Sequence, residues 1–283
     1  RRVPWLRCPG SKSTRSSPTP SCGWAPTTRA RPSWTLTGKR SSCRKSQATC
    51  RTFSRCCPWP KPYPFRRILT KKLAEALHKE RPEVYKDPNH KPEMTCAVTK
   101  FEAMCGFRPP KEIAQHLTDY PEFTALVGDG MAKAYIEATE GSDGEVLKAA
   151  LKALFTAAMV AEKATVETQV AAMCKRLTDK DPLNALILRL NKQYPLDVGV
   201  FCPLFLNYIT LEPGDAMFLG ANEPHAYLDG DCIEAMACSD NVVRAGLTPK
   251  LRDTETLTTM LTYKAMKPVI QKGVMLDKNA RIY

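Results

Sequence analysis

A cation and a carboxylate lie two residues apart in Lys91-Pro92-Glu93, with types and spacing that could do chemistry. Proline disfavours the helical region for the residue before it, so Lys91 is expected in extended chain. Residues i and i+2 of an extended chain share a face, so Lys91 and Glu93 should project together. A carboxylate can ligate a metal ion, and an ammonium can hold a polyol oxygen or assist proton movement. The alternative is a solvated surface ion pair.

A second group of reactive side chains lies between residues 225 and 234. His225 and Tyr227 share one face of an extended chain by the same alternation. Two acids, Asp231 and Glu234, follow them. Imidazole and carboxylate groups are common metal ligands, although a lone histidine is more often a structural residue than a ligand.

Two strong cations complete the candidate set. Arg244 follows an asparagine turn, and a guanidinium suits two oxygens of an anion, although a surface salt bridge is its usual role. Lys250 follows Pro249 and suits a phosphate as a point charge.

Short strands must position these residues, because the chain beyond Leu196 alternates brief apolar runs with Gly, Asp and Asn turns. Such spacing favours a β-sandwich or barrel. The expected strands are Phe205–Leu211, Ala216–Leu219, Ala226–Leu228, Ile233–Ala237 and Val242–Ala245, and an earlier one is expected at Thr95–Phe101.

Helical spacing dominates the middle of the chain. Glu145–Leu177 is Ala-rich and periodic, and it predicts one long or two shorter helices. Gly128-Asp129-Gly130 is expected to be a turn. Further helices are expected at Lys71–Lys79, Pro110–Leu117, Asp181–Gln193 and Thr254–Leu261.

The net charge of +13 comes from one end of the chain. Residues 1–70 hold 16 Lys and Arg and no acid, whereas the rest holds 26 basic against 29 acidic residues. The body is therefore mildly acidic, which argues against a nucleic-acid partner.

The 12 cysteines do not form a ladder of short spacings. We expect reduced thiols in a cytoplasmic protein, with disulfides as the alternative. The sequence has no apolar run of 18 residues and no early run of signal-peptide length, so we expect neither membrane insertion nor secretion.

Several blocks, in order, resemble the zinc-dependent type I phosphomannose isomerases across about residues 71–262. They are Asn89–Met94, Cys105–Pro109, Gln193–Pro195, the turn within Leu211–Leu219 and the whole of 221–250. The resemblance implies a mixed α+β fold, a partial cupin-type β-barrel (jelly roll) with an inserted α-helical domain. We expect an aberrant segment at 1–70, part of the catalytic unit at 71–108, the helical insert at 109–195, and further cupin strands at 196–283.

The resemblance also implies a zinc ion held by a Gln-x-His pair, a Glu and a later His. Glu93 and His225 match the last two ligands, but Arg66 and Ile68 stand at the Gln and first His positions. Arg244 matches the arginine expected beside the transferring proton. Lys91, Tyr227, Glu234 and Lys250 match residues that line the substrate pocket.

The implied activity is interconversion of D-mannose 6-phosphate and D-fructose 6-phosphate through an enediol, feeding GDP-mannose synthesis. With two of four ligands, this chain is expected to bind zinc poorly and to have little activity. The alternative is a catalytically dead cupin that acts as a binding module. We expect a sugar phosphate as ligand, no nucleic-acid or membrane partner, and a monomer.

Residues 63–71 have the sequence that results when codons for the family's segment at this position are translated in a shifted reading frame. Its Leu-Ser-Ile-Gln-Ala-His-Pro-Asn-Lys can be written CTA TCC ATT CAG GCG CAT CCT AAC AAA G. Read from the second base, these codons give Tyr-Pro-Phe-Arg-Arg-Ile-Leu-Thr-Lys, the sequence of residues 63–71. We interpret residues 1–70 as a shifted-frame translation of the family's N-terminal region. We expect them to be disordered or non-native and to supply no strands.

Overall fold

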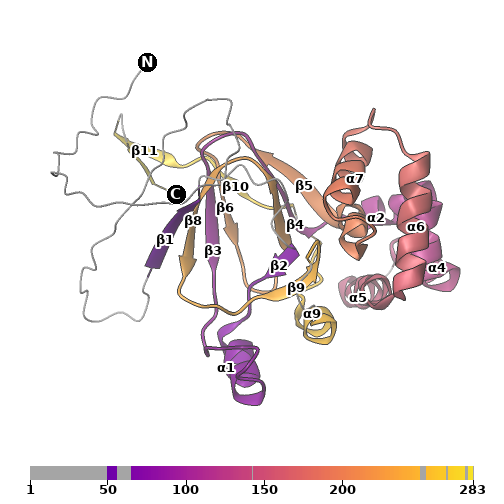
Figure 1. Ribbon diagram of the computed structural model, residues 1–283, viewed down its shortest axis with the longest axis horizontal. Coiled ribbons are helices and arrows are strands. Elements are labelled where there is room, and N and C mark those ends of the chain that lie inside the picture. Colours follow the sequence, from indigo (N-terminus) through magenta and orange to yellow (C-terminus); the bar gives the residue numbers. More distant parts are fainter. Residues whose placement is uncertain are drawn as a thin grey trace, which may run out of the picture. The chain divides into compact units, whose positions relative to one another are not determined.

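The computed structural model describes residues 50–55, 65–141, 143–248, 253–265, 267–277 and 280–282. These residues form two five-stranded sheets, a small hairpin and a group of helices (Figure 1). The mixed α+β class predicted from the sequence is confirmed. Most of residues 1–70, and Lys250, lie outside the described residues.

The first sheet has the strand order β1-β8-β3-β6-β10, and all its neighbours are antiparallel. Its central strand β3 alternates buried and half-buried residues, as expected for a strand with one face towards a core. The strands are β1 (Cys50–Arg55), β8 (Cys232–Ala237), β3 (Glu93–Ala97), β6 (Ala216–Leu219) and β10 (Ile270–Gln271).

The second sheet has the order β5-β4-β7-β2-β9, also antiparallel. Its strands are β5 (Leu206–Leu211), β4 (Phe101–Phe107), β7 (His225–Asp229), β2 (Phe65–Arg67) and β9 (Val243–Gly246). A separate hairpin pairs β11 (Val274–Asp277) with β12 (Ala280–Ile282).

The inner faces of the two sheets share one apolar cluster. Met217 and Leu219 from β6 pack there with Ala103 and Cys105 from β4, and Ile68 completes the cluster just after β2. The sheets therefore face one another like the two halves of a jelly roll, which agrees with the predicted partial barrel.

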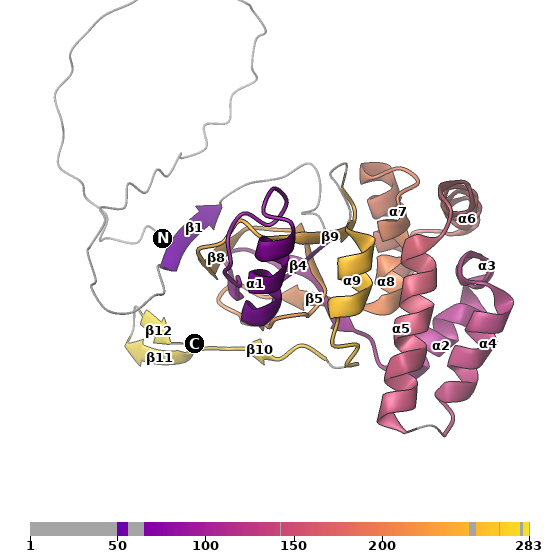
Figure 2. The ribbon, with the colours of Figure 1, turned by 90° about the horizontal axis from the view of Figure 1, so that it is seen from below.

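Helices fill the chain between β4 and β5 and lie together on one side of the strands (Figures 1 and 2). Asp143 and Asp181 begin two of them by accepting backbone hydrogen bonds, as N-caps do. The helices are α2 (Pro110–Asp119), α3 (Pro121–Val127), α4 (Asp129–Ala138), α5 (Gly144–Val160), α6 (Lys163–Arg176), α7 (Pro182–Gln193), the 3-10 turn η1 (Val198–Phe201) and α8 (Cys202–Phe205). Outside this group lie α1 (Lys71–Glu80) and α9 (Thr254–Met260).

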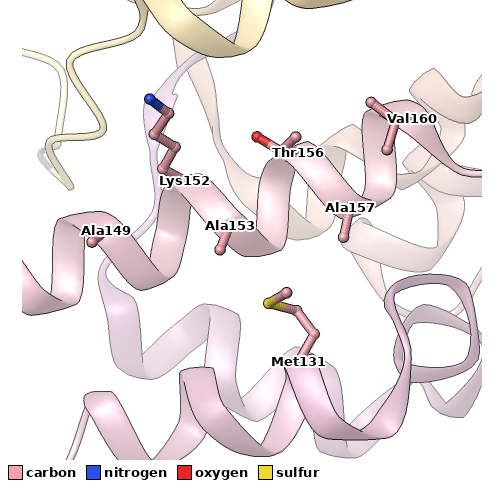
Figure 3. A pocket seen from close by; sticks show the side chains of 7 residues that line it. All are labelled: Met131, Ala149, Lys152, Ala153, Thr156, Ala157 and Val160. Carbon is pink, nitrogen blue, oxygen red and sulfur yellow. The ribbon is translucent and has the colours of Figure 1, made fainter.

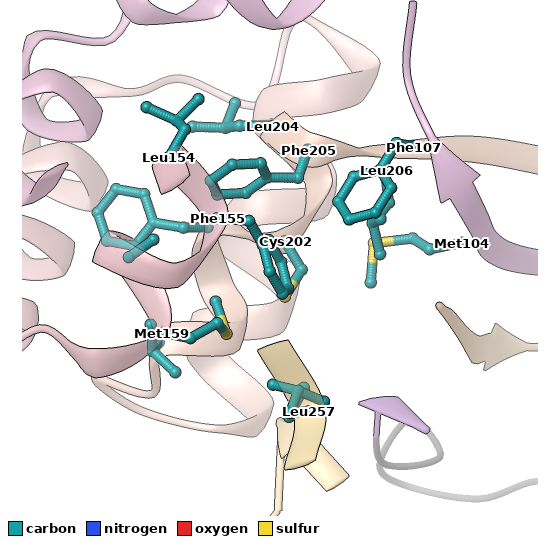
Figure 4. Close-up of a cluster of buried hydrophobic side chains, with 14 of the residues drawn as sticks. Met104, Phe107, Leu154, Phe155, Met159, Cys202, Leu204, Phe205, Leu206 and Leu257 are labelled. Carbon is teal, nitrogen blue, oxygen red and sulfur yellow. The ribbon is translucent and has the colours of Figure 1, made fainter. Parts of the chain in front are cut away.

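A larger apolar core joins the helical insert to the second sheet (Figure 4). Phe155 of α5 packs edge-on against Phe107 of β4 and Phe205 of α8, with ring centroids 5.4 and 5.1 Å apart. Such pairs add to the stabilisation that burial of the rings provides. These ring contacts anchor the helical insert to β4, whose other face lines the space between the two sheets.

Two local predictions need correction. The strand expected at Thr95–Phe101 is interrupted, because β3 ends at Ala97 and β4 begins at Phe101. The turn expected at Gly128–Gly130 is confined to Gly128, whose φ of 90° separates α3 from α4; Asp129 and Gly130 already belong to α4.

The expectation that residues 1–70 supply no strands is wrong at two places. Cys50–Arg55 pairs with β8, and Phe65–Arg67 pairs with both β7 and β9. A ladder uses backbone N–H and C=O groups, which every residue except proline offers, so neither segment needs the family's side chains to pair. Ile68 and Leu69, which follow β2, are apolar and buried.

Candidate active site

The candidate residues gather between the inner faces of the two sheets. The first sheet contributes Glu93 from β3 and Glu234 from β8, both buried. The second contributes His225 and Tyr227 from β7 and Arg244 from β9. β3 thus meets the consecutive strands β7, β8 and β9, more than 100 residues later in the chain, in one interior space.

Glu93 is the centre of the closest contacts. Its Oε2 lies 3.5 Å from Nε2 of His225, and its Oε1 lies 3.7 Å from Nζ of Lys91. The Glu93 and His225 side chains are each 4% exposed, and that of Lys91 is 13% exposed. The predicted shared face of Lys91 and Glu93 is confirmed, and the surface ion pair is excluded because the carboxylate is buried.

The orientation of His225 follows from its second ring nitrogen. Nδ1 lies 3.2 Å from the carbonyl oxygen of Glu223. A carbonyl only accepts, so Nδ1 carries the proton in this hydrogen bond and Nε2 faces Glu93. This is how a histidine is oriented when Nε2 is to act on a ligand or a metal ion.

Tyr227 is tied to both sheets. Its hydroxyl makes a short hydrogen bond with the hydroxyl of Thr95, at the middle of β3. Burial, then the charges of Glu234 and Glu93, raises the pKa of the Tyr227 phenol well above its ordinary value. The phenol therefore stays protonated near neutral pH, beside two carboxylates.

Strand register places Arg244 on the same row as His225. Arg66 of β2 lies opposite His225 on one side and opposite Arg244 on the other. Two strand spacings put the backbones of His225 and Arg244 about 10 Å apart. A molecule of a few carbon atoms could therefore touch both.

The described residues do not form a catalytic zinc site. Such a site needs about three protein ligands, and no group of three or more His, Cys, Asp or Glu able to hold a metal occurs among the described residues. Glu93 and His225 are two donors, and Ile68, where the family resemblance predicts a histidine, is an apolar side chain that is 1% exposed.

Thr95 is the site residue that the sequence analysis missed. It is fully buried, two residues beyond Glu93 in β3, so strand alternation alone could have placed it on the inner face. Asp231 lies instead in the turn between β7 and β8, where its backbone bonds to Val98 and Thr99. Lys250 lies outside the described residues.

An open apolar pocket of about 460 Å³ lies elsewhere, between α4 and α5 (Figure 3). Met131 of α4 faces a row of α5 side chains across it, and Lys152 is its one charged residue. The pocket shares no residue with the inter-sheet group.

Family models match both the strands and the helices. Residues 68–110 match the model described as "Phosphomannose isomerase type I, catalytic domain". Residues 126–206 match "Phosphomannose isomerase type I, helical insertion domain". Over these regions the chain belongs to the type I phosphomannose isomerase family. The resemblance found in the sequence is confirmed.

Curated relatives of the phosphomannose isomerase region come from animals and plants. Mannose-6-phosphate isomerase from Bos taurus is 49% identical over 201 residues, which is 68% of this chain and 47% of that protein. Mannose-6-phosphate isomerase 2 from Arabidopsis thaliana is 47% identical over 212 residues, 73% of this chain and 48% of that protein. The chain therefore spans about half the length of the curated relatives it matches.

Solved phosphomannose isomerase structures have the same arrangement. A lysine-to-alanine mutant from Salmonella typhimurium matches with a TM-score of 0.66 and 30% identity, covering 77% of this chain and 56% of that one. A zinc-bound mannose 6-phosphate isomerase matches with a TM-score of 0.60 and 30% identity, covering 73% and 52%.

Among the described residues, no helix is long and apolar enough to cross a membrane.

Proposed function

We propose that this chain derives from an aldose–ketose isomerase that interconverts D-mannose 6-phosphate and D-fructose 6-phosphate through an enediol, feeding GDP-mannose synthesis. One observation carries the proposal: Lys91, Glu93, His225, Tyr227 and Glu234 converge between the sheets of a family member. Relatives named mannose-6-phosphate isomerase support the choice of substrate.

Each polar group has a proposed task. The reaction moves a proton between C1 and C2, so it needs a base and a partner for the negative charge of the enediolate. Glu234 and Lys91 are the candidates for the base. Arg244 holds the developing charge, because its guanidinium stays protonated and can bond two oxygens. Tyr227, protonated at neutral pH, donates a hydrogen bond to a substrate hydroxyl.

The phosphate needs a cation at the rim of the site. Lys250 remains the proposed contact. It lies five residues after Ala245 of β9, which directly follows Arg244. Zinc is the cofactor proposed for the intact enzyme, and a zinc-bound neighbour supports it. The described residues of this chain do not fit that ion, so we propose that the chain as written is impaired.

The remaining proposals concern the setting of the enzyme. We propose a monomer that binds a small sugar phosphate, with no nucleic-acid or membrane partner. We also propose a cytoplasmic location, which is consistent with six described cysteines that are free thiols. The domain limits at 70, 108 and 195 stay proposals. A catalytically dead cupin is the alternative function.

An isomerase assay on a repaired chain tests the function. Arg66→Gln with Ile68→His restores the ligand types that the family resemblance implies. We expect zinc-dependent formation of fructose 6-phosphate from mannose 6-phosphate by the repaired chain and a rate at least about 100-fold lower for the chain as written. A matched repair that also carries Arg244→Ala should lose this rate.

The assay also separates the alternative. A repaired chain that folds, binds zinc and mannose 6-phosphate, and still produces no fructose 6-phosphate would favour the binding module. Circular dichroism on each variant, together with metal analysis, shows whether a silent variant is folded and loaded.

A further inference from the structure

Two loops that lead to the cations of the site are in contact with each other. The loop at 87–91 leads into β3 and carries Lys91, and the loop at 239–241 joins β8 to β9 and leads to Arg244. Neither loop is part of a ladder, so something else must set their separation. Asp87 lies at the start of the first loop and contacts the second.

The carboxylate of Asp87 bridges the loops directly. Its Oδ1 accepts from the backbone N–H of Asn89 and is 2.9 Å from Oγ of Ser239. Its Oδ2 accepts from the backbone N–H of Asp240, also at 2.9 Å. Both carboxylate oxygens are therefore used, and each has a partner in the 239–241 loop.

Hydrogen bonds donated from the second loop back to the first reinforce the bridge. The side-chain amide of Asn241, which is 3% exposed, donates to the backbone carbonyls of Asp87 and Asn89. Nearby, the N–H of Ala237 donates to the carbonyl of Pro92 at 3.2 Å. The contact thus extends the β3–β8 pairing past the end of the sheet.

The charge on Asp87 is stabilised where it lies. Burial opposes ionisation, but the hydrogen bonds from Asp240, Asn89 and Ser239 outweigh it, and the pKa of Asp87 is lowered. Hydrogen bonds to a charged acceptor are shorter and stronger than neutral ones. An ionised carboxylate at this place therefore holds the two loops more firmly than an amide would.

We infer that Asp87 is a positioning residue that fixes the Lys91 segment against the Arg244 segment, so that one sugar phosphate can contact both cations. The inference rests on the proposed function for its ligand but not for the loop coupling. Asp87 itself does not need to touch the substrate. Its effect passes through the backbone of 88–91 and 239–243.

Two readouts on the full chain test this role. Hydrogen exchange measured by mass spectrometry reports the loops, and calorimetric titration with mannose 6-phosphate reports binding. Asp87→Ala should raise exchange in 238–246 and 88–92 by about tenfold and weaken mannose 6-phosphate binding by at least about tenfold. Asp87→Asn keeps one acceptor and should give a smaller change in both.

Glu122→Gln is the matched control. Glu122 is also a buried carboxylate with a lowered pKa, but it pairs with Arg176 in the helical insert. Glu122→Gln should leave hydrogen exchange in 238–246 and the affinity for mannose 6-phosphate unchanged. If Asp87→Ala fails to fold, Asp87→Asn carries the test alone.

The outcomes separate the two proposals. Unchanged exchange in 238–246 for both Asp87 variants overturns the coupling. Raised exchange with unchanged affinity, in a chain that binds mannose 6-phosphate, reduces Asp87 to a structural brace and overturns its positioning role. If the chain repaired by Arg66→Gln and Ile68→His does not bind mannose 6-phosphate either, that counts against the proposed function, and the exchange result still supports or overturns the coupling.

Discussion

Two strands that border the same inter-sheet space, β3 and β2, differ in what they supply to it. The inner face of β3 carries Glu93 and Thr95, which contact His225 and Tyr227 of the opposite sheet. The segment that follows β2 places Ile68 among Cys105, Met217 and Leu219. β3 brings polar atoms to named partners, whereas Ile68, just after β2, brings an apolar side chain.

The difference separates the requirements of a fold from those of a site. Backbone pairing accepts nearly any residue, so β2 joins β7 and β9 although its sequence differs from the one that the family resemblance predicts. A metal or proton site accepts only side chains with the right atoms within about 3 Å. A stretch with altered side chains can therefore complete a sheet and still leave the chemistry incomplete.

The largest expected effect comes from giving the β2 side a donor. Ile68→His adds a third candidate ligand to Glu93 and His225, so zinc affinity should rise at least about 100-fold. A competition titration with a chelator of known affinity, with metal analysis for stoichiometry, measures this. Ile68→Val is the control and should bind zinc as weakly as the parent. Equal affinities for His and Val would show that residue 68 does not face the other two donors.

The second-largest effect tests whether a polar side chain on the inner face of β3 stabilises the fold through a specific hydrogen bond. Thr95→Val preserves shape but removes the hydrogen bond to the Tyr227 hydroxyl. Loss of a buried hydrogen bond of this kind should lower the free energy of unfolding by about 1–2 kcal/mol. Urea denaturation measures it, with the slope m unchanged. Thr118→Val, on an exposed turn of α2, should change stability by less than about 0.5 kcal/mol. Similar values for both variants would mean that the Thr95 hydroxyl contributes nothing specific.

Local patterns were enough to predict much of the framework. The limits of β6 agree with the predicted Ala216–Leu219, because the Pro-Gly-Asp turn before it is unambiguous. The Ala-rich stretch divides into α5 and α6, one of the two predicted arrangements. Alternation correctly placed Lys91 and Glu93 together.

Contacts between distant segments were beyond the reach of local patterns. Thr95 meets Tyr227 132 residues away, and Asp87 meets Asp240 153 residues away. Nothing in the neighbouring sequence of either residue indicates its partner. The strands β1 and β2 were missed for a related reason, since their pairing depends on the strands already beside them and not on their own period.

The smallest effect tests whether the helical insert is independent of the β2–β3 difference. Arg176 donates two hydrogen bonds to Glu122, and they hold the pKa of Glu122 below its ordinary value. A lowered folded-state pKa adds stability above the unfolded carboxyl value of about 4.3, and that stability is lost as the pH falls through the folded-state value. Because Arg176 is partly exposed and therefore screened, Glu122→Gln should cost about 1 kcal/mol at pH 7.

This cost should shrink as the pH is lowered below about 4 and should be the same in the parent and in Ile68→His. Urea denaturation of the parent, Glu122→Gln, Ile68→His and the double variant across this pH range measures both the pH dependence of the cost and its additivity. Additive costs are expected because Glu122 lies in the helical insert, whereas Ile68 packs in the separate inter-sheet cluster. Non-additive costs would mean that residue 68, just after β2, affects the stability of the helical insert. The difference between β2 and β3 would then extend beyond the candidate site.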